Sequence, residues 1–481
     1  MVSHQNIISR IPRKINKSMT KYYFILHFLL YIPFHFFSQS IFEFKDFINI
    51  VKSNHPVIKQ CDIILKNAEN KLIKSKGAFD PIISSSMSRK DIDKNIYYNL
   101  FEGNLKIPIW SGIEFNSGIN QNYGSFLNPN DYISSDQLWY TGITLPVGRN
   151  LIIDSRLAEI KKSKEIIKLS IEEIKLIKND LIYDAIKKYW LWTEKYNDFK
   201  IYEEFVNLSY NRFLAVREGY FSGDLASIDS LESFIMYQTR LYNKSQYEKE
   251  FNNESILLSN FLWMENEIPL EITSKMIPPS YTILLNHPDL HVDTNLAIIN
   301  QMIDQHPAII SLNKKIKVQE INRKLSIENL KPNINLKYNF LSPNANINQL
   351  NFDNYRMGVN FNYSLFLRKE RSDLKLVNLK IRDLEYEKIL KKLALTNKTK
   401  QFINEFIFTE NQADILEDIT ENYSNLLKGE RLKFDAGESS VFLMNSRESK
   451  LIESKLTLVN LKVKAITYDY GIDWSLCLLN K

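Results

Sequence analysis

Cysteine, glycine and proline are all scarce in this chain of 481 residues. Its two cysteines, Cys61 and Cys477, are too few for a disulfide scaffold or a cysteine-rich zinc site, although they could pair with each other. With 13 glycines, 14 prolines, 44% hydrophobic and 25% charged residues, the composition excludes collagen-like, mucin-like and fully disordered proteins. The composition is that of a folded globular chain.

Net charge is also small once the first residues are set apart. The formal charge is +6, but residues 1–40 hold five bases, from Arg10 to Lys21, and no acid. Without those five, 57 basic residues stand against 56 acidic ones, which is a net charge of +1. So neutral a chain gives no support for nucleic-acid binding, which needs concentrated positive charge.

The first 40 residues have the pattern of an export signal. The bases are followed by an uncharged apolar run over residues 22–37 and then by Ser38-Gln39-Ser40, a small-x-small pattern that signal peptidase accepts. We predict a signal peptide at 1–40. An uncleaved anchor is the alternative, although 16 residues are short for a membrane span, which needs about 20. No cysteine follows the run, which disfavours a lipid anchor.

The remaining sequence contains an internal repeat. His55-Pro56 returns as His306-Pro307, and the same offset of 251 takes Pro81 to Pro332. Further on, Gly223 with its neighbours returns at Gly437, with an offset of 214. We therefore predict a first repeat at 41–265, a connector at 266–295, a second repeat at 296–473 and a tail at 474–481. Each repeat runs in the order helix, extended region, long helix, glycine tip and returning helix.

Long helices are predicted by the absence of helix breakers. No proline occurs from 147 to 268 or from 344 to the end, and no glycine occurs from 149 to 218 or from 359 to 428. Apolar residues recur there at steps of three, four and seven, which is typical of a coiled coil. A helix of 70 residues is about 100 Å long. A solvated coiled-coil rod would explain these helices, but not the segments between them.

Those segments alternate with a period of two. One predicted strand, at 332–340, carries apolar residues at even positions, and a second carries them at odd positions. In this second strand they are Met357, Val359, Phe361, Tyr363 and Leu365. The hairpin at 332–366 has a less regular counterpart in the first repeat, within 81–147. Its predicted strands are at 113–123 and 139–147. The preceding stretch, 82–109, is either a further extended element or a long loop. Such strands suit a barrel wall between lipid and water, or else a half-buried hairpin in a soluble domain. Four strands cannot close a barrel alone, so several chains must contribute.

The duplicated order of these motifs resembles the TolC-type outer membrane factor family over residues 42–473. The resemblance implies a mainly α fold with β: duplicated long coiled-coil helices form a periplasmic α-barrel, and a homotrimer places four strands per chain in a 12-stranded transmembrane β-barrel. It implies a passive, porin-like exit duct of a tripartite efflux pump in the outer membrane of a Gram-negative bacterium. The partners would be a periplasmic adaptor, an inner-membrane transporter and outer membrane lipid. A duct for type I protein secretion fits the same pattern.

The resemblance also assigns roles to the two glycine tips at 219–224 and 429–438. A glycine lets the chain reverse between helices, since it accepts positive φ at little cost. In the family such tips meet the adaptor. The candidate docking residues are Arg217, Gly223, Asp224, Arg431, Gly437 and Glu438. Acids that narrow the tunnel entrance in relatives correspond to Leu443 and Ser446 in the second repeat, so Asp229 and Glu232 of the first repeat are the possible aperture.

Other candidate sites are weaker. His287 and His291 suggest a metal, but Pro288 disfavours the helix that would bring them together, so we expect a connector there and no metal. His55 and His306 precede a proline at a helix start, where a capping role is expected. No catalytic motif or cofactor fingerprint occurs, and we predict no enzyme activity and no cofactor. The remaining rivals are a periplasmic adaptor, which needs only one helical hairpin, and a coiled-coil structural protein.

Overall fold

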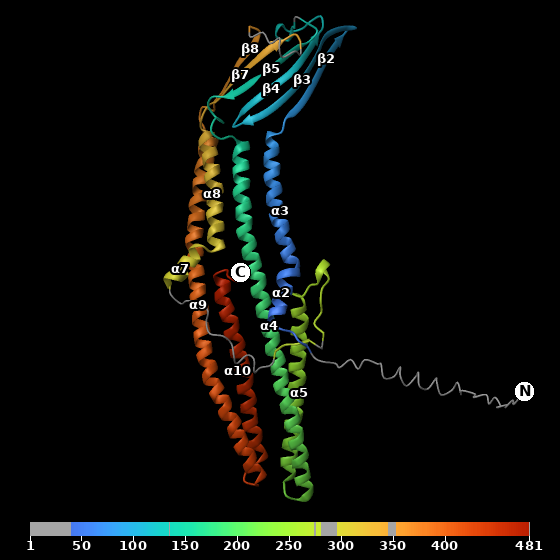
Figure 1. Ribbon diagram of the computed structural model, residues 1–481, viewed down its shortest axis with the longest axis vertical. Coiled ribbons are helices and arrows are strands. Elements are labelled where there is room, and N and C mark those ends of the chain that lie inside the picture. Colours follow the sequence, from blue (N-terminus) through green and yellow to red (C-terminus); the bar gives the residue numbers. More distant parts are fainter. Residues whose placement is uncertain (1–39, 134, 274–275, 280–295, 345–352, 481) are drawn as a thin grey trace, which may run out of the picture.

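The protein is an elongated molecule in which one β-sheet stands on a column of long helices (Figure 1). The computed structural model describes residues 40–133, 135–273, 276–279, 296–344 and 353–480. The predicted signal peptide, apart from Ser40, and the residues around His287 and His291 lie outside the described residues. Within the described ranges, no helix is both long enough and apolar enough to cross a membrane.

Each half of the chain contributes four helices of closely matching length. The first half has α2 (Phe44–Asn54), α3 (Pro56–Lys76), α4 (Ser155–Ser222) and α5 (Ser227–Ser259). The second half has α7 (Leu296–Asp304), α8 (Pro307–Glu328), α9 (Arg368–Asp435) and α10 (Val441–Ser475). Both α4 and α9 contain 68 residues, which corresponds to about 100 Å. The long helices predicted from the missing glycines and prolines are therefore confirmed.

The helices lie side by side in one layer. In the half of the column next to the sheet, contacts run from α3 to α4, from α4 to α8 and from α8 to α9. In the other half, α5 packs on α4, α4 on α10 and α10 on α9. The layer therefore has α3 and α5 along one edge and α9 along the other.

Two aromatic clusters fill the middle of the column. Phe47, Tyr189 and Trp192 are fully buried where α2, α4 and α5 meet, and Tyr189 donates a hydrogen bond to the Phe42 carbonyl at 2.7 Å. The second cluster joins α4, α7, α9 and α10 around Ile186 and Phe402. The second cluster fixes the two halves of the chain to each other, whereas the first packs elements of the first half together. Each large ring removes roughly 150–250 Å² from water.

The sheet is antiparallel throughout, with the strand order β2-β3-β4-β5-β7-β8. The strands are β2 (Ile82–Ile92), β3 (Asn95–Trp110), β4 (Ile113–Tyr123), β5 (Leu138–Pro146), β7 (Asn333–Ser342) and β8 (Tyr355–Asn362). The predicted mainly α fold with β is confirmed, but the sheet of one chain has six strands where four were expected. The open question about 82–109 is answered by two further strands.

Two other departures concern single segments. Tyr363 and Leu365, predicted to lie in a strand, follow the last residue of β8, because the chain turns there toward α9 and Leu367 takes a φ of 48°. Ser40–Ile41 (β1) pairs in parallel with Met276–Ile277 (β6) beside the column. Short 3₁₀ turns occur at Gly77–Phe79 (η1), Pro129–Asp131 (η2) and Glu265–Glu267 (η3).

Candidate functional site

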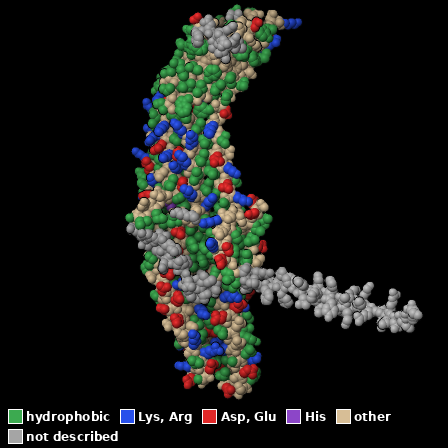
Figure 2. Space-filling model, in the orientation of Figure 1, with side chains coloured by type: hydrophobic (Ala, Val, Ile, Leu, Met, Phe, Trp, Pro, Cys, Tyr) green, Lys and Arg blue, Asp and Glu red, His purple; other side chains and the backbone are tan. Residues whose placement is uncertain are grey.

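One face of the sheet is apolar and exposed. The pairing register places one alternate residue of every strand on this face, so that Met357 lies beside Tyr338, and Tyr338 beside Ile143. Exposed large apolar residues on this face include Ile83, Met87, Ile143, Leu336, Met357, Val359 and Phe361. Figure 2 shows hydrophobic side chains gathered over the sheet, with most charged side chains on the helices below. Such a surface has the composition of a lipid-facing wall.

The opposite face of the sheet is polar. Its residues include Asn104, Asn116, Asn120, Asn335, Asn339 and Asn360 together with several charged side chains. On this face Tyr140 donates a hydrogen bond to Glu102 at 3.1 Å, and Lys106 forms an ion pair with Glu114 at 2.7 Å. Amides and paired charges of this kind suit a water-filled lumen and do not suit lipid.

A polar cluster fixes the sheet to the top of α4. Asp154 caps α4 by accepting the Leu157 N–H at 2.8 Å, and it also accepts the Gly112 N–H from the β3–β4 turn at 3.2 Å. Arg156 binds Asp154 at 2.7 Å and Glu114 of β4 at 3.2 Å. One aspartate and one arginine therefore set the position of the sheet over the helical column.

Each helical tip turns through a glycine in the left-handed region. The φ values are 83° at Gly223 and 77° at Gly437, where side chains are strained. At the first tip the Asp224 N–H donates to the Gly219 carbonyl at 2.9 Å, and at the second the Glu438 N–H donates to the Lys433 carbonyl at 2.8 Å. These bonds match the Schellman geometry that ends many helices. The predicted chain reversal at both glycines is confirmed.

The tips expose apolar as well as charged side chains. Large exposed residues there are Phe221, Ile228, Leu231, Leu432 and Phe442. Among the predicted docking residues, Asp224, Arg431 and Glu438 are exposed, while Arg217 is half-buried against the Phe213 ring at 5.6 Å. The structure brings all six predicted residues to the same end of the column, because both long helices end there.

The two acids predicted for an aperture each have a partner within the chain. The Asp229 carboxylate accepts the Ala226 N–H at 3.3 Å at the start of α5. Glu232 accepts a hydrogen bond from the Asn445 side chain of α10 at 3.2 Å. Both side chains are half-buried, so part of each carboxylate remains open to solvent.

A buried charge cluster near the tips is a feature that the sequence analysis missed. Glu448 of α10, only 2% exposed, binds Arg212 of α4 and lies 3.5 Å from Arg240 of α5. Burial lowers the pKa of Arg240, and the neighbouring Glu448 charge opposes that shift. Arg212 and Glu448 lie 236 positions apart and belong to no shared motif, so only the fold reveals this cluster.

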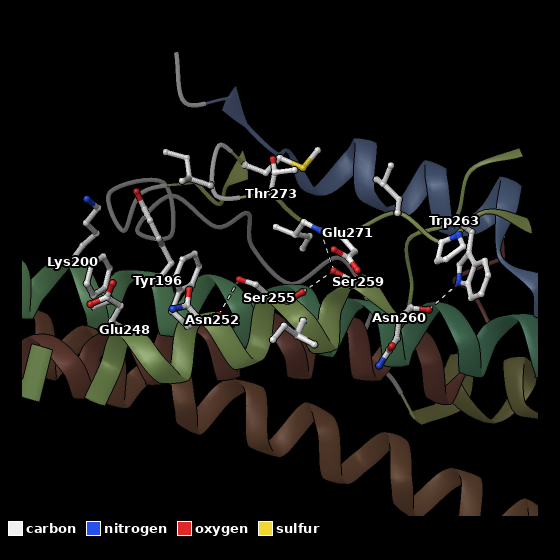
Figure 3. A pocket seen from close by; sticks show the side chains of 18 residues that line it. Tyr196, Lys200, Glu248, Asn252, Ser255, Ser259, Asn260, Trp263, Glu271 and Thr273 are labelled. Carbon is white, nitrogen blue, oxygen red and sulfur yellow. Dashed lines mark hydrogen bonds between the residues drawn. The ribbon is translucent and has the colours of Figure 1, made fainter. Parts of the chain in front are cut away.

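A hollow of about 960 Å³ lies beside the middle of α4 and the C-terminal end of α5 (Figure 3). Tyr196 and Lys200 of α4, Asn252 of α5 and Trp263 of the following segment line it. Ser259 accepts the Ile272 N–H at 3.0 Å, which holds the segment that carries residues 269–273 against α5. These contacts make the hollow part of the packing between that segment and the helices.

The remaining predicted residues have structural roles or carry no site. The Nδ1 atoms of His55 and His306 accept the N–H of Val57 at 3.2 Å and of Ala308 at 3.1 Å, so both expected caps are confirmed. Cys61 and Cys477 are free thiols. Among the described residues, no cluster of His, Cys, Asp and Glu side chains could hold a metal.

Solved outer membrane channels share this architecture. The chain aligns with the Campylobacter jejuni CmeC outer membrane channel over 90% of its length and 85% of that chain, at 12% identity and a TM-score of 0.62. It aligns with CusC, solved in a study of transmembrane channel formation, over 90% and 91% of the two chains, at 11% identity and a TM-score of 0.65. It aligns with the open state of the Neisseria gonorrhoeae MtrE outer membrane channel over 90% of its own length and 88% of that chain, at 9% identity and a TM-score of 0.61.

No family model and no curated protein sequence matches the chain. At identities near 10%, the structural likeness rests on the shape of the chain and not on particular side chains. The chain therefore has the fold of the TolC-like outer membrane channels, as the duplicated sequence motifs led us to expect.

Proposed function

We propose that the protein is a passive exit duct of a tripartite efflux pump in the outer membrane. The observation that carries the proposal is the sheet itself, with an apolar exposed outer face and a polar inner face, standing on helices about 100 Å long. Such a wall places lipid on one side and water on the other. The helices continue the conduit into the periplasm as a tunnel.

The duct is a homotrimer in this proposal. The helical layer carries large apolar residues along both of its edges, which a single chain leaves in water. On α9 these are Leu376, Leu379, Tyr386, Ile389, Leu390 and Leu393, each more than half exposed. On α3 and α5 they include Ile63, Ile73, Ile235, Tyr242 and Ile256. Packing α9 of one copy on α3 and α5 of the next closes the tunnel and buries both sets.

The tips dock a periplasmic adaptor in this proposal, and the adaptor connects the duct to an inner-membrane transporter. Exposed apolar side chains such as Phe221 and Phe442, ringed by Asp224, Arg431 and Glu438, make a surface of the mixed composition that transient protein interfaces have. The two-repeat division at 41–265 and 296–473 belongs to the same proposal. The duct supplies no energy and catalyses no reaction.

Expression of the full chain with its first 40 residues tests the proposal. We expect the protein in the outer membrane fraction, soluble only with detergent, with the mass of a trimer that resists dissociation until it is heated. Planar bilayers that receive the purified trimer should show discrete conductance steps. A water-soluble monomer that never fractionates with the envelope would overturn the proposal.

A further inference from the structure

We infer that each chain contributes all six strands to the membrane wall, so that the trimer closes an 18-stranded barrel in which β2 of one copy pairs with β8 of the next. The inference rests on the proposed trimer and deepens it, because it sets the diameter of the lumen. The strand order leaves β2 and β8 as the two edges of the described sheet. All eleven residues of β2 and all eight residues of β8 are exposed in the single chain.

Exposed edges cannot remain free in lipid. A strand edge carries N–H and C=O groups that find no water in the bilayer core, where each unsatisfied group costs several kcal/mol. The helical layer ends at the same places as the sheet, since α3 leads into β2 and β8 is followed by α9. The contact between copies that closes the helical tunnel therefore continues upward as the contact between β2 and β8.

The β2–β3 hairpin has the same two faces as the rest of the sheet. Register places Ile83 beside Leu105 and Met87 beside Phe101 on the apolar face. Ser84 lies beside Asn104 and Ser86 beside Glu102 on the polar face. A hairpin folded away from the wall would have no need of this alternation, whereas a hairpin within the wall needs both faces.

The width of the helical layer leaves room for six strands. Four helices next to the sheet, packed 8–10 Å apart, occupy about 32–40 Å of circumference per chain. Strands 4.7–4.9 Å apart and tilted by about 36° occupy about 6 Å each, so that six cover about 36 Å and four only about 24 Å. Six strands therefore meet the four helices without a change in diameter.

Strand direction and stagger both permit closure. Directions alternate across the sheet, so β8 of one copy and β2 of the next are antiparallel. One row of paired residues crosses the sheet through Ile82, Lys106, Asn116, Gly142, Asn339 and Arg356. Arg356 precedes the last residue of β8, Asn362, by six positions.

We choose the register between copies that pairs β2 with β8 from the first residue of β2 to the last residue of β8. Ile82 of the next copy then lies beside Asn362. The row that starts at Ile82 reaches β8 at Arg356, six residues before Asn362, so the pairing shifts by six residues over six strands, or one residue per strand. An eight-stranded barrel with a shear of eight has the same ratio and a tilt of about 36°, close to the usual 35–45°. The register then places Ser86 opposite Gly358 on the lumen face and Met87 opposite Met357 on the lipid face.

Disulfide trapping tests this contact. In a chain with Cys61→Ala and Cys477→Ala, we introduce Ser86→Cys and Gly358→Cys together. Both positions are exposed, and a side chain at residue 358 meets open space. Mild oxidation of the membrane-inserted protein should give covalent dimers and trimers on a denaturing gel, with more than half of the chains linked. Each single variant should give none beyond background.

Two control pairs separate the alternatives. Ser86→Cys with Asn335→Cys places the second thiol on β7, away from the edge, and should stay monomeric. Asn116→Cys with Gly358→Cys links copies only if β4 and β8 meet in a 12-stranded barrel. Linkage of that pair in place of the first, or no linkage of the first pair in a protein that remains a membrane-embedded trimer, would overturn the inference and leave the proposed duct standing. A soluble monomer would instead refute the duct itself.

The diameter of the barrel gives an independent measurement. Barrel diameter grows about linearly with strand number, so 18 strands make a barrel about one and a half times as wide as 12. Averaged projection images of the detergent-solubilised trimer should show that width. Deleting residues 82–110 should reduce it by about a third, and an unchanged diameter in that variant would contradict a place for β2 and β3 in the wall.

Discussion

Arg240 of α5 and Glu448 of α10 lie 3.5 Å apart, both almost completely buried, and join the two helical hairpins close to their tips. Arg212 of α4 binds the same carboxylate, and Arg240 also donates to Ser449 at 2.9 Å. One glutamate of the second repeat thus holds two helices of the first. Since the tips are the surface proposed to meet an adaptor, this cluster sets how the two hairpins are presented.

Replacing Glu448 should destabilise the lower half of the column. The change Glu448→Ala leaves two buried arginines without their counter-charge, and removing one partner of a buried pair costs about 3–5 kcal/mol. Thermal unfolding followed by helical circular dichroism measures the effect. Glu453→Ala is the matched control, because Glu453 is exposed and pairs with the exposed Lys450. Equal unfolding temperatures for the two variants would contradict the role of the cluster.

Replacement by alanine should lower the stability of the fold at the two tip glycines and raise it at a glycine within a helix. Gly223→Ala and Gly437→Ala force a side chain into positive φ and should each cost about 1 kcal/mol. Gly429→Ala, within α9 and facing open space, should stabilise by about 0.5–1 kcal/mol. Denaturant unfolding of the three variants checks the signs. A gain in stability at either tip would show that the left-handed turn is not required.

His306 should make stability depend on pH. Burial lowers the pKa of His306 to about 4, and the Lys391 charge adds to the shift. The unfolded chain takes up a proton near the ordinary value of 6.5, whereas the folded chain does so only near 4. The stability contributed by the neutral imidazole is therefore present above pH 6.5 and is lost as the pH falls toward 4.

The variant His306→Asn isolates this effect, because asparagine caps a helix and does not titrate in this range. Unfolding temperatures measured between pH 7 and pH 4 should fall less in this variant than in the parent chain. His55→Asn is the comparison, since His55 caps α3 in the same way but is less buried. Parallel pH profiles for the parent chain and His306→Asn would refute the assignment.

The aperture hypothesis predicts a change in ion selectivity. Three copies of Asp229 and Glu232 would place six carboxylates around the tunnel entrance and attract cations. The double change Asp229→Asn and Glu232→Gln should therefore reduce cation selectivity and block by divalent ions in single-channel recordings. Glu218→Gln, a loss of charge on the neighbouring helix α4, serves as control. Unaltered selectivity and block in the double variant would remove the aperture.

The helices were predictable to a large extent because their signals are local. A proline after His55 and His306 sets a helix start, and a glycine at 223 and 437 sets a reversal. The strands were predictable where one face is continuously apolar, as on β7 and β8. Serines at positions 84, 85, 86 and 88 interrupt both faces of β2, so the sequence pattern there resembles a loop as much as a strand.

By itself the sequence determined the export signal we predict, the repeated order of helices and tips, and the amphipathic strands, since each depends on residues close together in the chain. Tertiary structure alone decided that six strands share one sheet, that Arg212 and Arg240 meet Glu448, and that β2 and β8 form its edges. These features depend on backbone hydrogen bonds and charges that join distant residues, and pairing of that kind has no period along the chain.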